Sequence, residues 1–219
     1  MPEEGIVKYH SIWHRVPPDF VEVKALQNLN YWRSRLRLKG VIGVNEDNIG
    51  FGNISYRIKH EIEEEKNRYS RFVITATQTG HLNQLQAEHL ALVTRYSLLD
   101  NSVECFGESR ASSEALAHAV LYQENELCNS VIHIHNRIIW ERARDSYPMT
   151  DTRAEYGTPE LAKSIAELIS DWKKGDTDEV GKNGGIIILG GHRDGIIIFD
   201  SSLEKAGNAT VELVKRYSR

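Results

Sequence analysis

The segment Val131-Ile132-His133-Ile134-His135 is the most informative stretch of the chain. Its β-branched residues predict a strand, and residues two apart on a strand point to the same face. Both imidazoles therefore project together while the isoleucines face the core. Two neutral imidazoles a few ångströms apart suit Zn²⁺ or a similar divalent ion. A hydrogen-bonded structural pair, or one histidine acting as acid or base, is the alternative interpretation.

Helices and strands alternate on both sides of this segment. Strands are expected at 53–58, 71–75, 130–135, 186–189 and 196–199, with a hairpin about Asp100-Asn101. Helices are expected at 20–39, 86–94, 112–124, 136–144, 158–171 and from 201 to the end. Several neighbouring strands are joined too closely for helical crossovers. This favours an α/β fold with a mainly antiparallel sheet and helices on its faces.

The helix ends carry recognisable signals. Gly40 supplies a C-terminal cap, and Ser112 or Ser113 is expected to cap the helix that precedes the histidine strand. Thr158 with Pro159 opens a later helix, and the last helix opens at Ser201 with a capping-box spacing. The charged run 60–68 and the glycine-bearing stretch 173–184 are expected to be loops.

Composition narrows the class of protein. The chain has 219 residues, of which 40% are hydrophobic and 26% charged, and no linker divides it. We therefore expect a single domain over 1–219, with residues 1–19 as an N-terminal arm. The net charge of −4 and the lack of a basic stripe argue against a nucleic-acid partner. Short apolar runs argue against a membrane span, and two cysteines without a secretory signal favour the cytoplasm.

Two further residues are candidates to complete a metal site. Glu114 follows two serines at the start of a helix, where an acid that only complements the helix dipole is the simpler interpretation. His192 lies in a glycine-rich turn between two apolar strands, and the alternative is that it is merely exposed. His118 falls on the same helix face as Glu114, and a hydrogen-bonded core histidine is favoured there.

Three small clusters could bind a phosphate group. They are Gly50–Ser55 with Asn53, the polar turn ending in Thr79-Gly80, and the pair Ser112-Ser113 at a helix N-terminus. Such turns and helix ends bind anions through backbone N–H groups and the helix dipole. No GxSxG, P-loop or GxGxxG motif occurs, so nothing supports a hydrolase elbow or a nucleotide cradle.

Taken in order, these motifs resemble the class II aldolase/adducin family over about residues 25–215. The matching stretches are Gly52-Asn53-Ile54-Ser55 with Arg57, Phe72–Thr75 leading to Thr79-Gly80, Ser112-Ser113-Glu114 with His118 and Tyr122, the two-histidine strand, and His192 before a Ser-Leu-Glu-Lys-Ala helix. The resemblance implies a three-layer α/β/α sandwich with a mainly antiparallel central sheet. It also implies a homotetramer with active sites at subunit interfaces.

The resemblance implies roles for particular residues. His133, His135 and His192 would bind Zn²⁺ or another divalent metal, with Glu114 as a displaceable fourth ligand and the catalytic proton carrier. The substrate phosphate would lie against Asn53, Thr79, Gly80, Ser112 and Ser113. The implied activity is that of an aldolase-type lyase acting on a small phosphorylated sugar or aldehyde through an enediolate.

Two alternatives remain within this resemblance. Sugar-phosphate 4-epimerases of the family carry aspartate after the serine pair, so Glu114 favours an aldolase over an epimerase or dehydratase. A non-catalytic adducin-like scaffold is the alternative from another class. By this resemblance the chain would be a divergent, shortened member. Its late motif is His192-Arg193-Asp194-Gly195 instead of His-Gly, its turn 75–80 is longer than usual, and its segment between His135 and Gly157 is shorter.

Overall fold

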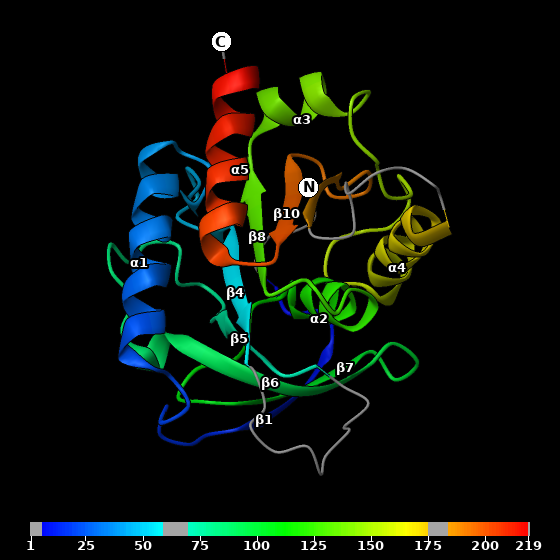
Figure 1. The fold of residues 1–219 in the computed structure, drawn as a ribbon. Coiled ribbons are helices and arrows are strands. Elements are labelled where there is room, and N and C mark those ends of the chain that lie inside the picture. Colours follow the sequence, from blue (N-terminus) through cyan, green and yellow to red (C-terminus); the bar gives the residue numbers. More distant parts are fainter. Residues whose placement is uncertain (1–5, 59–69, 175–183, 219) are drawn as a thin grey trace.

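The computed structural model describes residues 6–58, 70–174 and 184–218. An eight-stranded sheet forms the centre of this part of the chain, in the order β1-β7-β6-β5-β4-β8-β10-β9 (Figure 1). Its strands are β1 (His10–His14), β4 (Asn53–Arg57), β5 (Phe72–Thr75), β6 (Leu90–Ser97), β7 (Ser102–Phe106), β8 (Ser130–His135), β9 (Gly184–Ile188) and β10 (Gly195–Asp200). A small separate ribbon pairs β2 (Gly43–Val44) with β3 (Gly50–Phe51).

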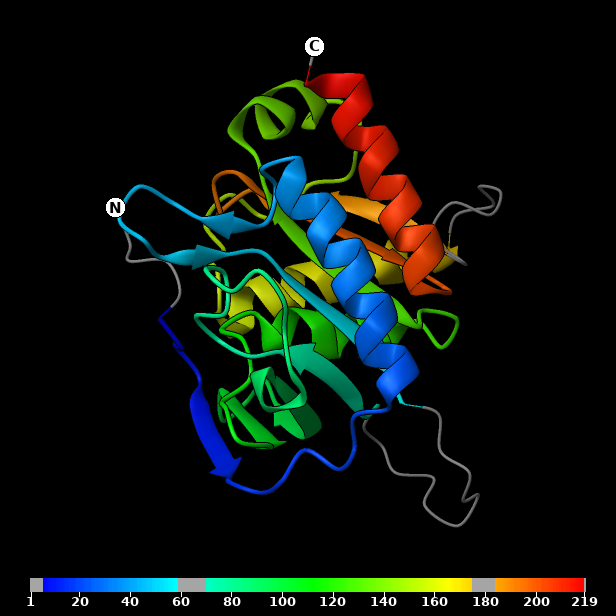
Figure 2. The same ribbon diagram turned by 90° about the vertical axis from the view of Figure 1, so that its left-hand side faces the viewer.

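The sheet is mainly antiparallel, as the short connections predicted. Among the strands of the described residues, β1 and β7 pair in parallel, and the other strand pairs of the large sheet are antiparallel. Helices cover both faces, which gives three layers (Figure 1, Figure 2). One layer holds α1 (Val23–Leu38), α3 (Arg137–Ala143) and α5 (Leu203–Tyr217), and the other holds α2 (Ala115–Glu124) and α4 (Pro159–Lys174). The predicted three-layer α/β/α sandwich is confirmed.

Strand β8 divides its side chains between the two layers because successive residues of a strand face opposite ways. Ile132 and Ile134 are fully buried against α1, α3 and α5. Val131 belongs to the core on the other face, beside α2 and α4. His133 and His135 share the face of Val131, so the imidazoles point toward the α2 layer. Burying each isoleucine contributes about 1.5–3 kcal/mol, which holds the strand in this register.

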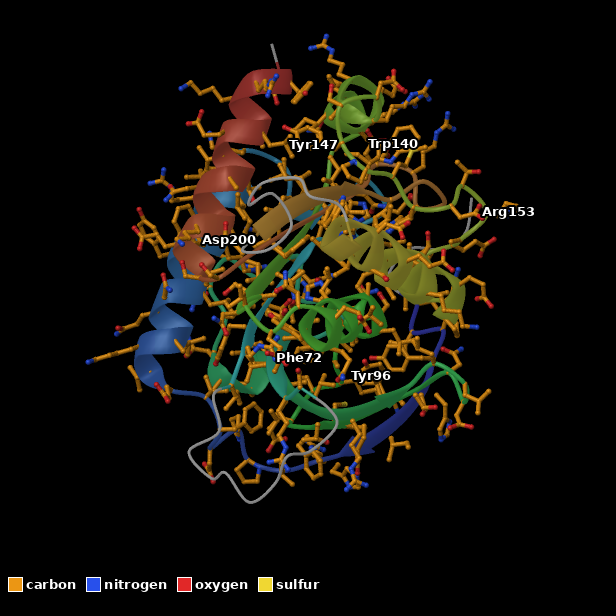
Figure 3. The ribbon with its side chains drawn as sticks, turned by 45° about the vertical axis from the view of Figure 1, so that its right-hand side comes forward. Phe72, Tyr96, Trp140, Tyr147, Arg153 and Asp200 are labelled. Carbon is orange, nitrogen blue, oxygen red and sulfur yellow. The ribbon has the colours of Figure 1, made fainter. Side chains whose placement is uncertain are left out.

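Aromatic residues pack in the core between the sheet and the α2 and α4 layer. Phe72 points inward from β5 toward α2 (Figure 3), and its ring centroid lies 4.9 Å from that of Tyr122. Both side chains are fully buried. This contact fixes α2, whose N-terminus carries Glu114, against the middle of the sheet.

Most of the predicted helix ends are confirmed. Gly40 adopts a φ of +68° directly after α1, and Thr158 Oγ1 accepts a hydrogen bond from Leu161 N at the start of α4. Ser202 Oγ accepts from Lys205 N at the start of α5. The start of α2 differs, because Glu114 itself occupies the N-cap position and Ser112 Oγ accepts from Glu114 N at 3.3 Å.

The helix predicted at 86–94 is wrong. The segment makes one short 3₁₀ turn, η1 (Ala87–His89), and continues as strand β6. β6 pairs with β5 on one side and β7 on the other, and this double pairing outweighs the local helical spacing of its apolar residues. The hairpin about Asp100-Asn101 is present between β6 and β7, with Asn101 at a φ of +46°.

Residues 6–19 of the predicted N-terminal arm lie against the body of the protein. They contribute β1, an edge strand paired with β7, and Trp13 Nε1 donates to Gly107 O at 2.9 Å. The loops predicted at 60–68 and through most of 173–184 lie outside the described residues. Within the described part of the chain, none of the helices is both long enough and apolar enough to cross a membrane.

Candidate metal centre

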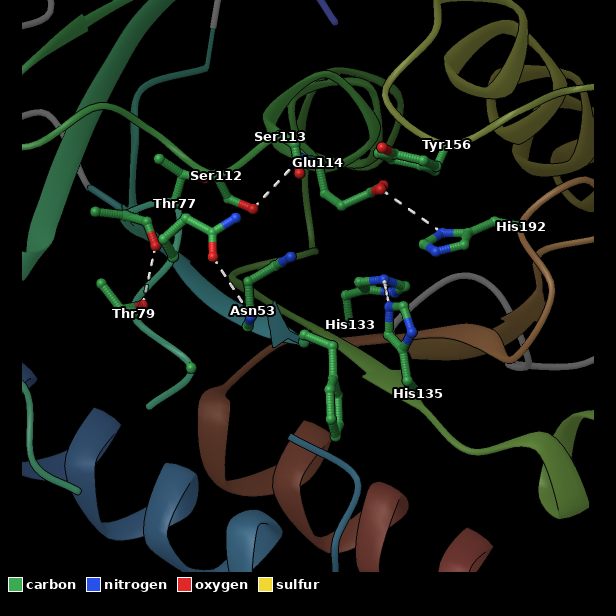
Figure 4. A pocket seen from close by; sticks show the side chains of 16 residues that line it. Asn53, Thr77, Thr79, Ser112, Ser113, Glu114, His133, His135, Tyr156 and His192 are labelled. Atoms are coloured by element: carbon green, nitrogen blue, oxygen red, sulfur yellow. Dashed lines mark hydrogen bonds and ion pairs between the residues drawn. The ribbon is translucent and has the colours of Figure 1, made fainter. Parts of the chain in front are cut away.

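The three histidines singled out in the sequence converge. His133 and His135 extend from β8, and His192 lies in the turn between β9 and β10 (Figure 4). One ring nitrogen from each lies within 4.8 Å of the others. The Nε2 atoms of His133 and His135 are 2.8 Å apart. The antiparallel pairing of β8 with β10 places Gly195 opposite His135, and this brings the His192 turn back over the strand.

Close backbone packing positions His192. A Cβ atom added at Gly191 would lie 2.2 Å from Ala154 O, so the turn approaches the 150–154 segment more closely than any side chain would allow. Thr150 Oγ1 accepts from Gly190 N at 2.9 Å, and His192 O accepts from Gly195 N at 2.9 Å. One hydrogen bond thus joins the turn to Thr150 and the other closes the turn on itself. The His192 ring is buried.

The hydrogen bonds and burial favour the ligand form of the imidazoles. His133 Nδ1 lies 3.2 Å from Ile196 O, and because a carbonyl only accepts, Nδ1 carries the hydrogen and Nε2 presents its lone pair to His135. Burial, followed by the nearby His135, holds the pKa of His133 well below its ordinary value of 6.5. Burial and then His135 likewise lower the pKa of His192. Neutral imidazoles are the form that binds metals.

Glu114 faces this cluster from the start of α2. It is 3% exposed, and its Oε1 lies 3.6 Å from His192 Nδ1, longer than a hydrogen bond (Figure 4). The sequence-based alternative, an acid that only complements the helix dipole, does not account for this burial. His118 lies one turn further along α2, fully buried, with its Nδ1 2.7 Å from Ser55 Oγ. It is a hydrogen-bonded core histidine, as favoured from the sequence.

One pocket brings the predicted residues together. It is a small pocket that opens to solvent, and its empty space of about 440 Å³ includes part of that opening. All nine predicted site residues line it: Asn53, Thr79, Gly80, Ser112, Ser113, Glu114, His133, His135 and His192. The walls also include Phe51, Thr77 and Gln78, which belong to the predicted glycine-rich and polar turns, and Tyr156, which the sequence reasoning did not identify. Arg193 is exposed and does not line the pocket.

Tyr156 is the most prominent of the missed residues. Its ring centroid lies 5.1 Å from that of His192, and Lys8 Nζ lies 4.0 Å from the same tyrosine ring. Its hydroxyl points toward Glu114 (Figure 4). The signal for it in the sequence was weak: an aromatic residue directly before the Gly157-Thr158-Pro159 helix start. Tyr147 and Tyr217 lie outside this pocket and pack against each other with their ring centroids 6.2 Å apart.

The donor set fits a divalent metal. Zinc sites commonly use three histidine nitrogens with a carboxylate or water as the fourth ligand. Zn–N bonds of about 2.0–2.1 Å in a tetrahedron place ligand nitrogens about 3.3 Å apart. The three ring nitrogens lie within 4.8 Å of one another, which is close to that spacing. The His133, His135 and His192 cluster could therefore hold a metal ion.

The fold and this cluster together define a class: a three-layer α/β protein with a candidate three-histidine metal site beneath a helix N-terminus. Residues 45–217 match the family described as the class II aldolase and adducin N-terminal domain. The chain belongs to this family.

Solved structures share the fold at low sequence identity. YgbL from Klebsiella pneumoniae is 19% identical, with a TM-score of 0.61 over 91% of this chain and 87% of that one. A sugar-phosphate aldolase from Thermotoga maritima is 16% identical, with a TM-score of 0.62 over 89% and 92%. An L-fuculose 1-phosphate aldolase is 19% identical, with a TM-score of 0.59 over 90% and 86%. No curated protein matches the sequence.

Proposed function

We propose that this protein is a divalent-metal-dependent aldolase-type lyase that acts on a small phosphorylated sugar. The observation that carries the proposal is the buried Glu114 carboxylate beside the three-histidine cluster, with Oε1 3.6 Å from His192 Nδ1. A carboxylate buried beside three imidazoles can serve both as a metal ligand and as a proton carrier.

His133, His135 and His192 are the residues that would hold the metal, with Glu114 as a displaceable fourth ligand. When bound, zinc or another divalent ion supplies a Lewis acid that stabilises the negative oxygens of an enediolate. The tautomer of His133, set by Ile196 O, keeps its Nε2 directed toward the cluster.

Glu114 is the residue we propose to move the proton. In the cleavage direction the hydroxyl beside the scissile carbon–carbon bond loses its proton, that bond breaks, and an aldehyde leaves. The other fragment keeps the electron pair and is protonated at carbon. A carboxylate inside the pocket, close to both the metal ligands and the substrate space, is suited to carry that proton.

The opposite wall of the pocket is the proposed phosphate subsite. Asn53, Thr79 and Gly80 approach it from the β4 and 77–80 side, and Ser112 and Ser113 from the N-terminus of α2. The N-terminus of a helix attracts anions through its dipole and its unpaired N–H groups. Holding the phosphate there would orient the reacting carbons and provide binding energy away from the bond that breaks.

An epimerase or a dehydratase would use the same residues, because it also passes through an enediolate-type species. A non-catalytic adducin-like scaffold has no need of a buried cluster of three histidines and a carboxylate, and this favours an enzyme. We also expect a cytoplasmic homotetramer with active sites at subunit interfaces. Sedimentation analysis tests the number of subunits.

The first experiment measures metal content in protein purified without added metal or chelator. We expect about one divalent ion per chain, and less than about a tenth of that in His133→Ala. His14→Ala, an exposed histidine on β1, is the matched control and should keep the metal. Retro-aldol cleavage is then screened over phosphorylated sugars. A wild-type protein that takes up no metal on titration would overturn the proposal.

A further inference from the structure

No positively charged side chain of the described residues lines the proposed phosphate subsite. Of the described residues that line the pocket, none is lysine or arginine. A phosphate ester carries up to two negative charges, and backbone N–H groups with hydroxyls offset them only in part. The positive charge nearest to the Thr79-Gly80 turn lies behind it, on helix α1.

Arg33 is buried behind this turn, with only 2% of its surface exposed. One of its terminal nitrogens donates to Leu82 O at 2.6 Å, and the other donates to Thr79 O at 2.7 Å. The acceptors are backbone carbonyls, and no carboxylate of the described residues pairs with this guanidinium. A buried arginine without an acidic partner leaves a full positive charge inside the protein.

Arg37 repeats the arrangement one turn further along α1. It donates to Gly80 O and, at 3.3 Å, to Asn83 Oδ1. Residues four apart lie on the same helix face, so the two guanidiniums are neighbours and repel each other. Two like charges are thus held side by side against one short turn, although a helix is destabilised by such a pair.

The peptide unit that joins Thr79 and Gly80, two residues of the pocket lining, accepts the hydrogen bond from Arg33. The peptide bonds here are trans, so the C=O and N–H of one peptide unit point in opposite directions. Because Arg33 holds Thr79 O, the N–H of Gly80 is directed away from the guanidinium. A cation on the carbonyl also polarises the unit and strengthens its N–H as a donor. Gly80 packs closely against Gly43, because a Cβ atom added at Gly80 would lie 2.1 Å from Gly43 O.

We propose that Arg33 and Arg37 are positioning residues for an anionic group of the substrate, acting through the Thr79-Gly80 turn. They hold the turn by its carbonyls and place their uncompensated charge behind the anion. This inference deepens the proposed function, since it assigns the source of the positive potential at the phosphate subsite.

The test measures binding of inorganic phosphate by calorimetry to the metal-loaded full chain. Arg37→Met removes one charge at a half-buried position and should weaken phosphate binding about tenfold, as expected for a unit charge acting through an effective dielectric near 20. Arg33→Met should weaken it at least as much. Arg37→Lys, which keeps the charge, should recover part of the loss. Arg35→Met, on the exposed face of the same helix, should bind like the wild type.

A purely structural role for the arginines predicts a different pattern. Phosphate affinity would then follow the melting temperature, and Arg37→Lys would bind no better than Arg37→Met. On a phosphorylated substrate, our proposal expects KM to rise while kcat and metal content stay near wild type. If Arg33→Met does not fold, the Arg37 variants decide the question.

The outcomes separate this inference from the function on which it rests. Suppose that the wild type binds phosphate and that folded Arg37→Met and Arg33→Met bind it with the same affinity. That result overturns the inference alone. A metal-loaded wild type that binds no phosphate overturns the phosphate subsite and the inference together, and leaves the metal proposal to its own measurement.

Discussion

The carboxylate of Glu114 and the imidazole of His192 face each other across the pocket, with Oε1 3.6 Å from Nδ1. One comes from the N-cap position of α2 and the other from the β9–β10 turn. Both side chains are almost completely buried. The sheet and helix layers must therefore pack correctly before this pair exists.

This pairing leads to a prediction for Glu114→Gln. The amide keeps the size of the side chain but cannot carry the proton, so we expect kcat for the cleavage reaction to fall by about 10²–10⁴-fold. The three histidines remain, so the metal should be retained, which elemental analysis checks. Glu126→Gln, at an exposed position beyond the C-terminal end of α2, is the matched control. Near wild-type turnover in Glu114→Gln would show that another group moves the proton.

Tyr156→Phe tests the hydroxyl that points toward Glu114. The ring and its contacts with His192 and Lys8 are kept, so stability should change by less than about 1 kcal/mol. We expect kcat to fall about tenfold or more because a hydroxyl donor near the reacting oxygens is lost. Steady-state kinetics and thermal unfolding measure the two effects. Tyr217→Phe, outside the pocket, should leave kcat unchanged. Full activity in Tyr156→Phe would show that Tyr156 contributes packing alone.

Gly191→Ala tests how the His192 turn is held. The added methyl group would meet Ala154 O at 2.2 Å, so backbone must shift and His192 with it. We expect a loss of about 2–4 kcal/mol in the free energy of unfolding, together with weaker metal binding. At Gly43 a Cβ atom would find its nearest neighbour at 3.7 Å, so Gly43→Ala should cost much less. Urea unfolding of the two variants gives the comparison, and equal losses would contradict this explanation of the turn.

Alkaline pH should destabilise the protein through Cys128. This thiol is fully buried, and burial raises its pKa from 9.0 to about 12. The unfolded chain loses the thiol proton above pH 9 while the folded chain keeps it, so stability is full below pH 9 and declines as the pH rises toward 12. The slope contributed by this group approaches about 1.4 kcal/mol per pH unit.

Cys128→Ala isolates that contribution. The variant loses some stability at every pH, but its free energy of unfolding should fall less steeply between pH 9 and 10 than that of the wild type. Urea unfolding at pH 8, 9 and 10 measures the slopes. Parallel slopes for the two proteins would contradict the assignment.

Local sequence patterns predicted much of the fold because each depends on neighbours in the chain. The two-residue period of β8, the Thr158 cap of α4 and the glycine after α1 are decided within a few residues, and all are confirmed. The segment 86–94 shows the limit of this approach. Its apolar spacing suits a helix, but pairing with β5 and β7 makes it a strand, and neither partner is visible from within the segment.

The candidate site divides in the same way. The sequence by itself determined that His133 and His135 share one strand face, and the family motifs marked the other pocket residues. Only the tertiary structure decided that His192 reaches them, that Tyr156 closes the pocket and that Arg33 lies behind the Thr79-Gly80 turn. Periodicity acts over a few residues, whereas these contacts join segments distant in the chain. They form only because burying the two hydrophobic cores brings helices and sheet together, and that free energy belongs to the whole fold.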